Sequence, residues 1–342
     1  MSEPFVGDRV VVRYRLGADT PADWRDTPNP AASAGPTLSD VTGIVVAGPD
    51  DGELIRLDRD GTVVNIPLTA VTSVRVLSRR TVRNSEIRAI EYAAAHGWPG
   101  VESTWIDGWL VRAGHGYTRR ANCAVPIDVD ARADGPTLTA IAAWYRERSL
   151  PPQLAWPDRL LPAAHLPGPL EQPVQVLTAR IDTITDSTHR TDDPEVAVEP
   201  TAGAGWLDVR LAPEPAARPA AGAPDGTGPD RAVAAAVINA VRDGQLMFAG
   251  IGDRGRLVAI GRGAVTATAA GQPVLGVTAL HTLPDHRGRG LAGRVLSALL
   301  RRGKELGADT VYLQVDAGNR AAGAWYRRLG FGLHHQYGYV VL

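Results

Sequence analysis

The sequence predicts an α/β protein with a mixed central sheet, preceded by a small all-β barrel. Three observations support this prediction. Short β-branched runs separated by turn residues fill the first 80 residues, helical and strand-like patterns alternate from residue 84 onward, and a strand, a glycine-rich turn and a helix follow one another over residues 275–307. With 342 residues, the chain is long enough for two or three domains.

Residues 1–80 are expected to form the barrel. Asp51-Gly52 and Asp60-Gly61 are typical of hairpin turns, and Pro67 to Ala70 predicts a one-turn connection. Residues 17–40, rich in Pro, Ala and Asp, would form a long first loop. The order of these runs resembles that of Src-homology-3 or Tudor barrels. The five expected strands are 6–16, 41–47, 54–58, 62–66 and 71–77.

Residues 84–184 are predicted to form a separate α/β segment. Five of the chain's 8 tryptophans lie between Trp98 and Trp156, which favours a packed core over a ligand-stacking site. The single cysteine, Cys123, is expected to be a small buried residue. Helices are expected over 85–96 and 138–148, and strands over 105–113, 120–127, 153–156 and 174–181.

Residues 185–230 look like an insertion and a linker around a short strand. Residues 185–205 are acidic and rich in turn formers, while residues 212–230 consist largely of Pro, Ala and Gly and cannot pack a core. The run from Trp206 to Leu211 is the expected strand. The last domain, 231–342, would begin with a helix over 231–242 and hairpin strands over 246–251 and 256–266.

The most informative stretch follows an apolar run, Leu275 to Leu283, that predicts a buried strand. After the run Pro284 to Ala292, apolar residues recur at helical spacing until Gly307 ends the helix. A strand that feeds a glycine-rich turn at a helix N-terminus presents unpaired N–H groups and the positive end of the helix dipole. Gly288 and Gly290 would let a ligand approach these amides, so the pattern predicts an anion site.

Two motifs in this region resemble a known family. Arg287-x-x-Gly290-x-Ala292 is similar to the acyl-CoA pyrophosphate loop of GNAT-type N-acyltransferases. Asn319-x-x-Ala322-x-x-x-Tyr326-x-x-x-Gly330-Phe331 resembles that family's second signature helix, with a predicted strand, 310–316, between the two motifs. The resemblance covers roughly the last third of the chain. It implies that acetyl-CoA is the co-substrate, bound by Thr282, Leu283, Arg287, Gly288, Arg289, Gly290, Leu291, Ala292, Asn319, Ala322 and Tyr326.

The same resemblance extends weakly into the middle segment. Asp107-Gly-Trp-Leu and Thr118 to Asn122 are similar to a segment that precedes the acyl-CoA half in a subset of GNAT proteins. Residues 84–184 would then be a degenerate or partial copy of the same fold, without an Arg-x-x-Gly-x-Gly loop.

Acyl transfer needs a stabilised thioester oxygen and two proton movements. The resemblance implies that a backbone N–H near His281 to Leu283 meets the oxygen and that Tyr326 protonates the departing thiolate. The sequence does not identify the general base, because the strand 275–283 contains no carboxylate. His281 has a suitable ordinary pKa, although strand alternation places it opposite Thr278 and Thr282, and a structural role is equally compatible. The alternatives are His334, His335, Tyr337 or a water relay.

The acceptor is expected to be a primary amine, either a peptide or protein lysine or a small metabolite amine, bound between the middle segment and the last domain. A cationic amine needs acidic neighbours, for which Asp107 and Glu102 are the candidates. A catalytically weak acyl-CoA-binding module is the alternative function. Nucleic-acid binding through Arg9, Arg13 and Arg15 is a weaker hypothesis, because alternating arginines on a strand usually mark a solvated face.

The composition limits the remaining classes. A net charge of −1 gives no general attraction to nucleic acid or to an anionic membrane. One cysteine excludes an internal disulfide framework and a cysteine-based zinc cluster, and no metal is expected. The N-terminus lacks the regions of a signal peptide and no run reaches the ~20 apolar residues of a membrane span, which favours a cytoplasmic protein. Homo-oligomerisation is left open.

Overall fold

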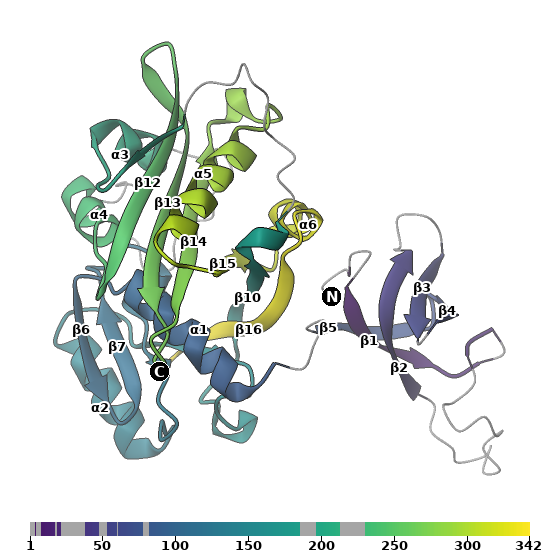
Figure 1. Ribbon diagram of the computed structural model, residues 1–342. Coiled ribbons are helices and arrows are strands. Elements are labelled where there is room, and N and C mark those ends of the chain that lie inside the picture. The colour runs from purple at the N-terminus through teal and green to yellow at the C-terminus, as the bar shows by residue number, and fades with distance from the viewer. Residues whose placement is uncertain are drawn as a thin grey trace. The chain divides into compact units, whose positions relative to one another are not determined.

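The computed structural model describes residues 4, 8–17, 19–21, 38–47, 53–59, 61–77, 82–184, 196–212 and 230–342. The backbone contacts divide the chain into two units, residues 1–82 with 317–324 and residues 83–316 with 325–342 (Figure 1). The predicted Asp51-Gly52 turn, most of the first loop, and residues 185–195 and 213–229 of the predicted insertion and linker lie outside the described residues.

The N-terminal unit contains a separate five-stranded antiparallel sheet with the order β4-β3-β2-β1-β5 (Figure 1). Val10 and Val12 are buried, whereas Arg13 points outward and pairs with Asp40 at 2.8 Å. The one-turn connection predicted from Pro67 to Ala70 joins β4 and β5. The described ladders do not pair β4 with β5. The strands are β1 (Arg9–Arg15), β2 (Leu38–Ala47), β3 (Leu54–Arg59), β4 (Thr62–Pro67) and β5 (Val71–Leu77).

The second unit is built on an eight-stranded sheet with the order β11-β12-β13-β14-β15-β10-β16-β9. Among the described strands, β14 and β15 are the one parallel pair in it, so the predicted mixed sheet is confirmed. The strands are β9 (Gln153–Pro157), β10 (Glu171–Arg180), β11 (Ala197–Glu199), β12 (Gly244–Asp253), β13 (Arg256–Ala267), β14 (Pro273–Thr282), β15 (Thr310–Asp316) and β16 (Gly332–Val341).

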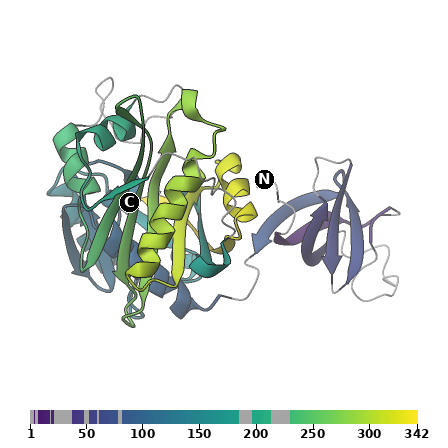
Figure 2. The same ribbon diagram turned by 45° about the horizontal axis from the view of Figure 1, so that its top comes forward.

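The middle segment, residues 84–184, divides its strands between the large sheet and a smaller one. Its strand β10 lies between β15 and β16, with Val174 opposite Asp316, and β9 forms the edge beside β16. Such pairing joins residues far apart in sequence, and no local pattern encodes it. The remaining strands, β6 (Glu102–Ile106), β7 (Trp109–Ala113) and β8 (Val125–Pro126), form a three-stranded sheet that packs with helix α2 (Gly135–Arg146) around a buried core (Figure 2).

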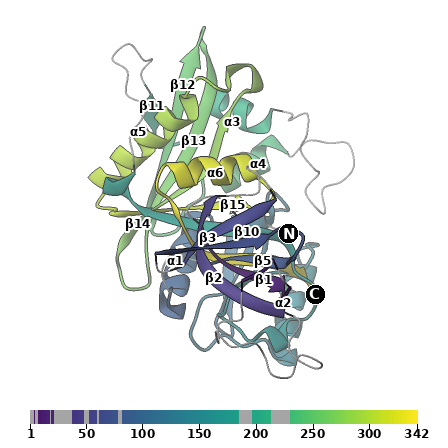
Figure 3. The ribbon, with the colours of Figure 1, turned by 90° about the vertical axis from the view of Figure 1, so that its right-hand side faces the viewer.

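Helices cover both faces of the large sheet. On one face, α5 (Leu291–Glu305) packs so closely on β13 that a Cβ added at Gly261 would lie 2.7 Å from Val295 of that helix. On the other face, Ile260 shares a core with α3 (Ala204–Leu211) and α4 (Arg231–Ile238), and α1 (Asn84–Gly97) packs beside them (Figures 1 and 3). No helix in the described part of the chain is long and apolar enough to span a membrane.

Four local predictions were wrong. The single strand predicted over 105–113 is part of a hairpin, in which β6 ends at Ile106 and β7 begins at Trp109. The run predicted as a strand near Trp206 forms helix α3, in which Trp206, Leu207 and Val209 are all buried. Apolar runs this short fit either element, and tertiary packing decided here. The short strand of this region is β11 instead. The strand predicted over 120–127 is a 3-10 turn, Arg119–Asn122, followed by β8, and α4 ends at Ile238 rather than at residue 242.

Candidate functional site

The large sheet opens where β14 leaves its parallel neighbour β15. The two strands pair only from Val274 opposite Thr310 to Val277 opposite Leu313, whereas β14 continues along β13 to Thr282. Just past the last paired residue, Ala279 has a φ of 51°, and the register with β13 shifts by one residue. This is a β-bulge, which bends a strand and increases its local twist. The bulge therefore coincides with the point where the two strands part.

The bulge also changes which side chains share a face. Thr278 lies opposite Arg262, and His281 lies opposite Ile260, two residues earlier on β13. Residues two apart on a regular strand point to the same face, so Thr278 and His281 share one. Strict alternation had predicted opposite faces, and the extra residue at the bulge is the reason for the difference. A contact of 3.5 Å from Arg262 Nη1 to Thr278 Oγ1 agrees with this assignment.

Thr282, at the end of β14, has two groups that can bind a ligand: its backbone N–H and its hydroxyl. Leu283 N–H donates to the carbonyl of Val258 at 2.9 Å, so that amide is already used. N–H groups alternate along an antiparallel strand, so Thr282 N–H points to the side that β15 has left. Thr282 Oγ1 is buried and has no hydrogen-bond partner among the described residues. Thr282, rather than Leu283, therefore offers donors at this point.

The loop after β14 leads directly into α5. After a 3-10 turn over Pro284–His286, Gly288 and Gly290 adopt φ values of 74° and 75°, and α5 begins at Leu291. The left-handed conformation favours glycine, and the space that a Cβ would occupy at either position is open. The amides of the first helical turn are therefore accessible at the positive end of the helix dipole. This geometry fits a diphosphate.

The arginines of the loop brace its backbone. Arg287 Nε donates to the carbonyl of Thr282 at 3.1 Å, and Arg289 Nη2 donates to the carbonyl of Asp285 at 3.1 Å. His286, which the sequence analysis did not single out, is buried and places Nε2 at 3.2 Å from Asp253 Oδ2. A guanidinium has five N–H groups, so Arg289 keeps donors beyond the one that bonds Asp285.

A cavity of about 240 Å³ lies beside the opening, on the face away from α5. Thr278 and Ala279 of β14 and Asp316 at the end of β15 form one wall. The other lining residues are Trp98, Thr118, Arg119, Arg120, Gln172, Val174, Arg210 and Tyr339. Trp98 is buried, as the tryptophan pattern predicted, yet it also lines this cavity, whereas Trp109 and Trp156 pack together in the core.

A buried arginine outside the predicted site, Arg262, packs against the ring of Trp98, which lines the cavity. Arg262 lies 4.5 Å from the centre of the Trp98 ring and donates to the carbonyls of Ile238, Gly97 and Ala240 at 2.7 to 2.9 Å. Burial lowers the pKa of Arg262 to about 9, which leaves the guanidinium charged at neutral pH. These carbonyls lie at the C-terminal ends of α1 and α4, where a cation is favourable. No local sequence pattern indicates this role for Arg262.

The other expected bases and acids lie elsewhere. His335 Nε2 is 2.8 Å from Glu91 Oε1, and His334 Nδ1 is 2.8 Å from His335 Nδ1, both in the interior. Neither histidine lines the cavity, and Tyr337 does not line it either. Asp107 accepts a hydrogen bond from Thr137 in a different hollow, and Glu102 pairs with an arginine of the α2 region. Asp107 and Glu102 therefore do not line this cavity, whereas Asp316 does.

The second signature motif forms helix α6 (Arg320–Arg328). Asn319 Oδ1 accepts the N–H of Ala322 at 3.2 Å, which is the geometry of a helix N-cap. Tyr326 is buried against the rings of Trp325 and Phe331. Burial raises the pKa of Tyr326 to about 12, so the phenol carries its proton at neutral pH.

The fold is shared with a solved acetyltransferase. A GCN5-related N-acetyltransferase from Kribbella flavida superposes with a TM-score of 0.50 at 18% identity, over 77% of this chain and 96% of that one. The fold, with the two sequence motifs, makes this chain a GNAT N-acetyltransferase. It belongs to the family described as "Probable histone acetyltransferase Rv0428c C-terminal", whose sequence profile matches residues 84–340.

Two curated relatives add to this assignment. The "Probable histone acetyltransferase Rv0428c" of Mycobacterium tuberculosis is 36% identical over 345 residues, which cover 99% of this chain and 96% of that protein. A shorter stretch of 53 residues, 16% of this chain, is 49% identical to 17% of the mycothiol acetyltransferase of Corynebacterium aurimucosum. The first likeness includes the N-terminal unit as well as the acetyltransferase fold, whereas the second is local.

Proposed function

We propose that this protein transfers the acetyl group of acetyl-CoA to a primary amine bound in the cavity beside Thr278, Ala279 and Asp316. One observation carries the proposal. The parting of β14 from β15 lies between the glycine loop at α5 and this cavity, so a donor held at the loop and an amine in the cavity would meet at β14. The acceptor can be a peptide or protein lysine or a small metabolite amine. The name of the Mycobacterium tuberculosis relative supports a protein lysine.

The chain's own groups suit the binding of acetyl-CoA. Backbone amides from Gly288 to Ala292 would bind the pyrophosphate, because the space beside Gly288 and Gly290 is open, and the guanidinium of Arg289 would assist. The N–H of Arg287 already donates to the carbonyl of Pro284 at 3.2 Å. The unpartnered hydroxyl of Thr282 would receive a polar group of the pantetheine arm. Acetyl-CoA supplies the acetyl group as an activated thioester. Roles for Asn319 and Ala322 in binding rest on the family motif.

Each chemical requirement has a candidate group. Thr282 N–H, which points into the opening, would donate to the thioester oxygen as it gains negative charge. Tyr326 would donate its phenolic proton to the departing sulfur, because its raised pKa keeps it protonated. A lysine-like amine with a pKa near ~10.4 arrives charged, and Asp316 is the carboxylate of the cavity that attracts it. His281 shares the face of Thr278 and is the candidate base.

Binding of acetyl-CoA is tested by thermal unfolding of a matched glycine pair. Gly290→Asp places bulk and negative charge at the proposed pyrophosphate site, whereas Gly271→Asp introduces the same side chain at φ 80° and in open space in the β13–β14 turn. Both variants share the strain of a left-handed aspartate. At 100 times its Kd, acetyl-CoA should stabilise the wild type and Gly271→Asp by about 2.7 kcal/mol. It should not stabilise Gly290→Asp.

Transfer itself is tested by mass spectrometry with labelled acetyl-CoA, a panel of lysine peptides and a panel of small amines. The proposal requires labelled product from at least one panel, and Gly271→Asp should retain that activity while Gly290→Asp loses it. Stabilisation by acetyl-CoA without any labelled amine would favour the catalytically weak binding module instead. Equal stabilisation of both glycine variants would remove the basis for the loop assignment.

A further inference from the structure

The cavity beside β14 contains three arginine side chains that differ in how their charge is compensated. Arg119 is fully engaged. Its Nη2 lies 2.8 Å from Glu171 Oε2, its Nη1 lies 2.9 Å from Gln172 Oε1, and its Nε bonds Gln153. Its guanidinium also stacks 4.8 Å from the centre of the Tyr339 ring. Arg119 therefore shapes the wall and leaves little capacity for a ligand.

Arg120 is compensated far less. Its one hydrogen bond to a described residue runs from Nε to the Tyr337 hydroxyl at 3.5 Å, which is a long contact. No described carboxylate lies within ion-pair distance of it. Glu91 shares a small hollow with Arg120 on the inner side, but Glu91 is bound to His335 at 2.8 Å. Arg120 lines the cavity, and no hydrogen bond to a described residue uses its two Nη groups.

Arg210, from helix α3, is the second incompletely bonded arginine. Its Nε is buried and has no hydrogen-bond partner among the described residues, and no ion pair joins it to a described carboxylate. Asp316 is the one carboxylate among the residues that line the cavity, so the positive charges there outnumber the negative ones. Buried donors without partners are uncommon in folded proteins and point to a group that is bound during function.

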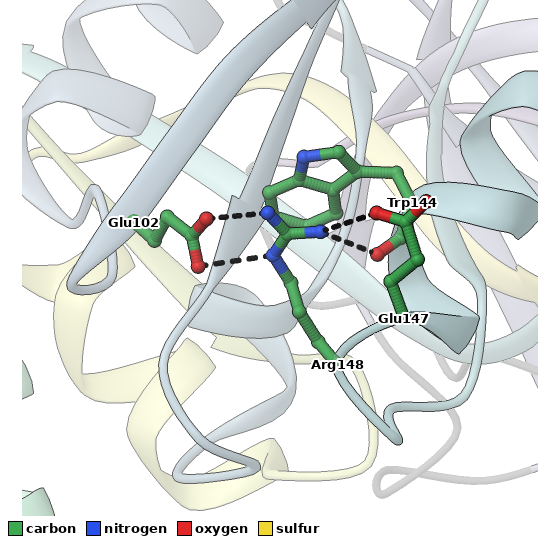
Figure 4. A network of polar contacts seen from close by, with 4 residues as sticks. All are labelled: Glu102, Trp144, Glu147 and Arg148. Atoms are coloured by element: carbon green, nitrogen blue, oxygen red, sulfur yellow. Dashed lines mark hydrogen bonds and ion pairs between the residues drawn. The ribbon is translucent and has the colours of Figure 1, made fainter.

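An arginine of the same unit shows the contrasting, fully bonded arrangement (Figure 4). Arg148 donates to both carboxylate oxygens of Glu102 at 2.5 and 2.9 Å, and its Nη1 reaches the Trp144 carbonyl at 2.8 Å and Glu147 at 3.5 Å. Its guanidinium lies 3.7 Å from the centre of the Trp144 ring. This residue does not line the cavity, so it supplies a matched control for the two incompletely bonded arginines.

We infer that Arg120 and Arg210 bind an anionic group, a carboxylate or a phosphate, carried by the acceptor amine itself. This inference rests on the proposed function and specifies its substrate class. Asp316 attracts the amine near the opening of β14, the two arginines receive the anion through N–H groups suited to planar, two-point contacts, and Trp98 and Tyr339 flank the part between them. The favoured acceptor is a small zwitterionic amine rather than a lysine within a basic peptide.

The test compares acceptors that differ in the anion alone. L-Phenylalanine is paired with L-phenylalaninamide for a carboxylate, and O-phosphoethanolamine is paired with ethanolamine for a phosphate. In at least one pair, the charged acceptor should have a kcat/KM about 10- to 100-fold above its neutral partner, as expected for charge-assisted hydrogen bonds. Arg210→Gln and Arg120→Gln should each reduce that ratio at least about 10-fold, mainly through KM, whereas Arg148→Gln should leave it unchanged.

A binding measurement separates failure of this inference from failure of the proposed function. Calorimetry is performed with N-acetyl-L-phenylalanine, its carboxamide and inorganic phosphate, which need no turnover. If no amine is acetylated but an anionic probe binds at least about 10-fold more tightly than the carboxamide, and Arg210→Gln removes the difference, the anion site stands and the proposed reaction fails. Equal binding and turnover of charged and neutral probes, or equal effects of Arg210→Gln and Arg148→Gln, would overturn the inference.

Discussion

Tyr326→Phe separates a catalytic hydroxyl from a structural one. The side chain of Tyr326 is only 9% exposed. The ring packs between Trp325 and Phe331, with ring centres 4.8 and 5.6 Å away, and phenylalanine preserves those contacts. The substitution therefore removes one proton donor and keeps the packing of the ring.

The substitution should affect catalysis far more than folding. Loss of a general acid should lower kcat by about 100-fold, which is equivalent to an increase of about 2.7 kcal/mol in the activation free energy of acetyl transfer. Folding stability should change by less than about 1 kcal/mol, because phenylalanine keeps the ring contacts of Tyr326 with Trp325 and Phe331. A purely structural tyrosine would give the reverse pattern.

Tyr145→Phe is the matched control. Tyr145 is fully buried, and its hydroxyl donates to the carbonyl of Arg112 at 3.0 Å, within the core around Trp109. Its replacement should cost about 1 kcal/mol of stability and leave kcat within about twofold. The assays are steady-state thiol release from acetyl-CoA with the best amine of the screen and urea unfolding monitored by tryptophan fluorescence.

The pH profile provides a second check on Tyr326. Burial raises the pKa of its phenol to about 12, so its deprotonation should not produce a falling limb in kcat below about pH 10. Unchanged kcat in Tyr326→Phe would refute the proton-donor role. A loss of kcat accompanied by an equal loss of acetyl-CoA affinity would assign the hydroxyl to binding rather than to proton transfer.

Two further predictions concern stability. Arg262→Met should lower the free energy of unfolding by about 2 to 4 kcal/mol in urea, because the buried carbonyls of Gly97 and Ile238 lose their donor; a cost under about 1 kcal/mol would contradict that role. The N–H of Thr137 lowers the pKa of Asp134, the N-cap of α2, so its carboxylate stabilises the folded state above its ordinary pKa of about 3.9, and this contribution is lost as pH falls through the lower folded value. Asp134→Ala should therefore be less stable than the wild type at pH 7 and converge with it by about pH 2, and parallel curves would exclude the linkage.

The sequence by itself determined the local parts of the acetyltransferase. The glycine spacing of the loop, the apolar stripe of α5 and the alternation of β15 depend on neighbours along the chain, and each appears in the structure within a few residues of its predicted bounds. The resemblance to the GNAT family rests on the same local motifs, and the family assignment confirmed it. Local periodicity was insufficient at Trp206, where a short apolar run formed a helix.

Only the tertiary structure decided how the site is completed. Ala279 takes a positive φ that no turn residue announces, and the resulting bulge reverses the predicted relation between Thr278 and His281. The cavity collects Arg120 and Arg210 from segments about 90 residues apart, while the carboxylates predicted for it, Asp107 and Glu102, lie elsewhere. Strand order in the sheet brings such residues together, and strand order depends on which distant backbones pair and pack, a choice that the local sequence does not record.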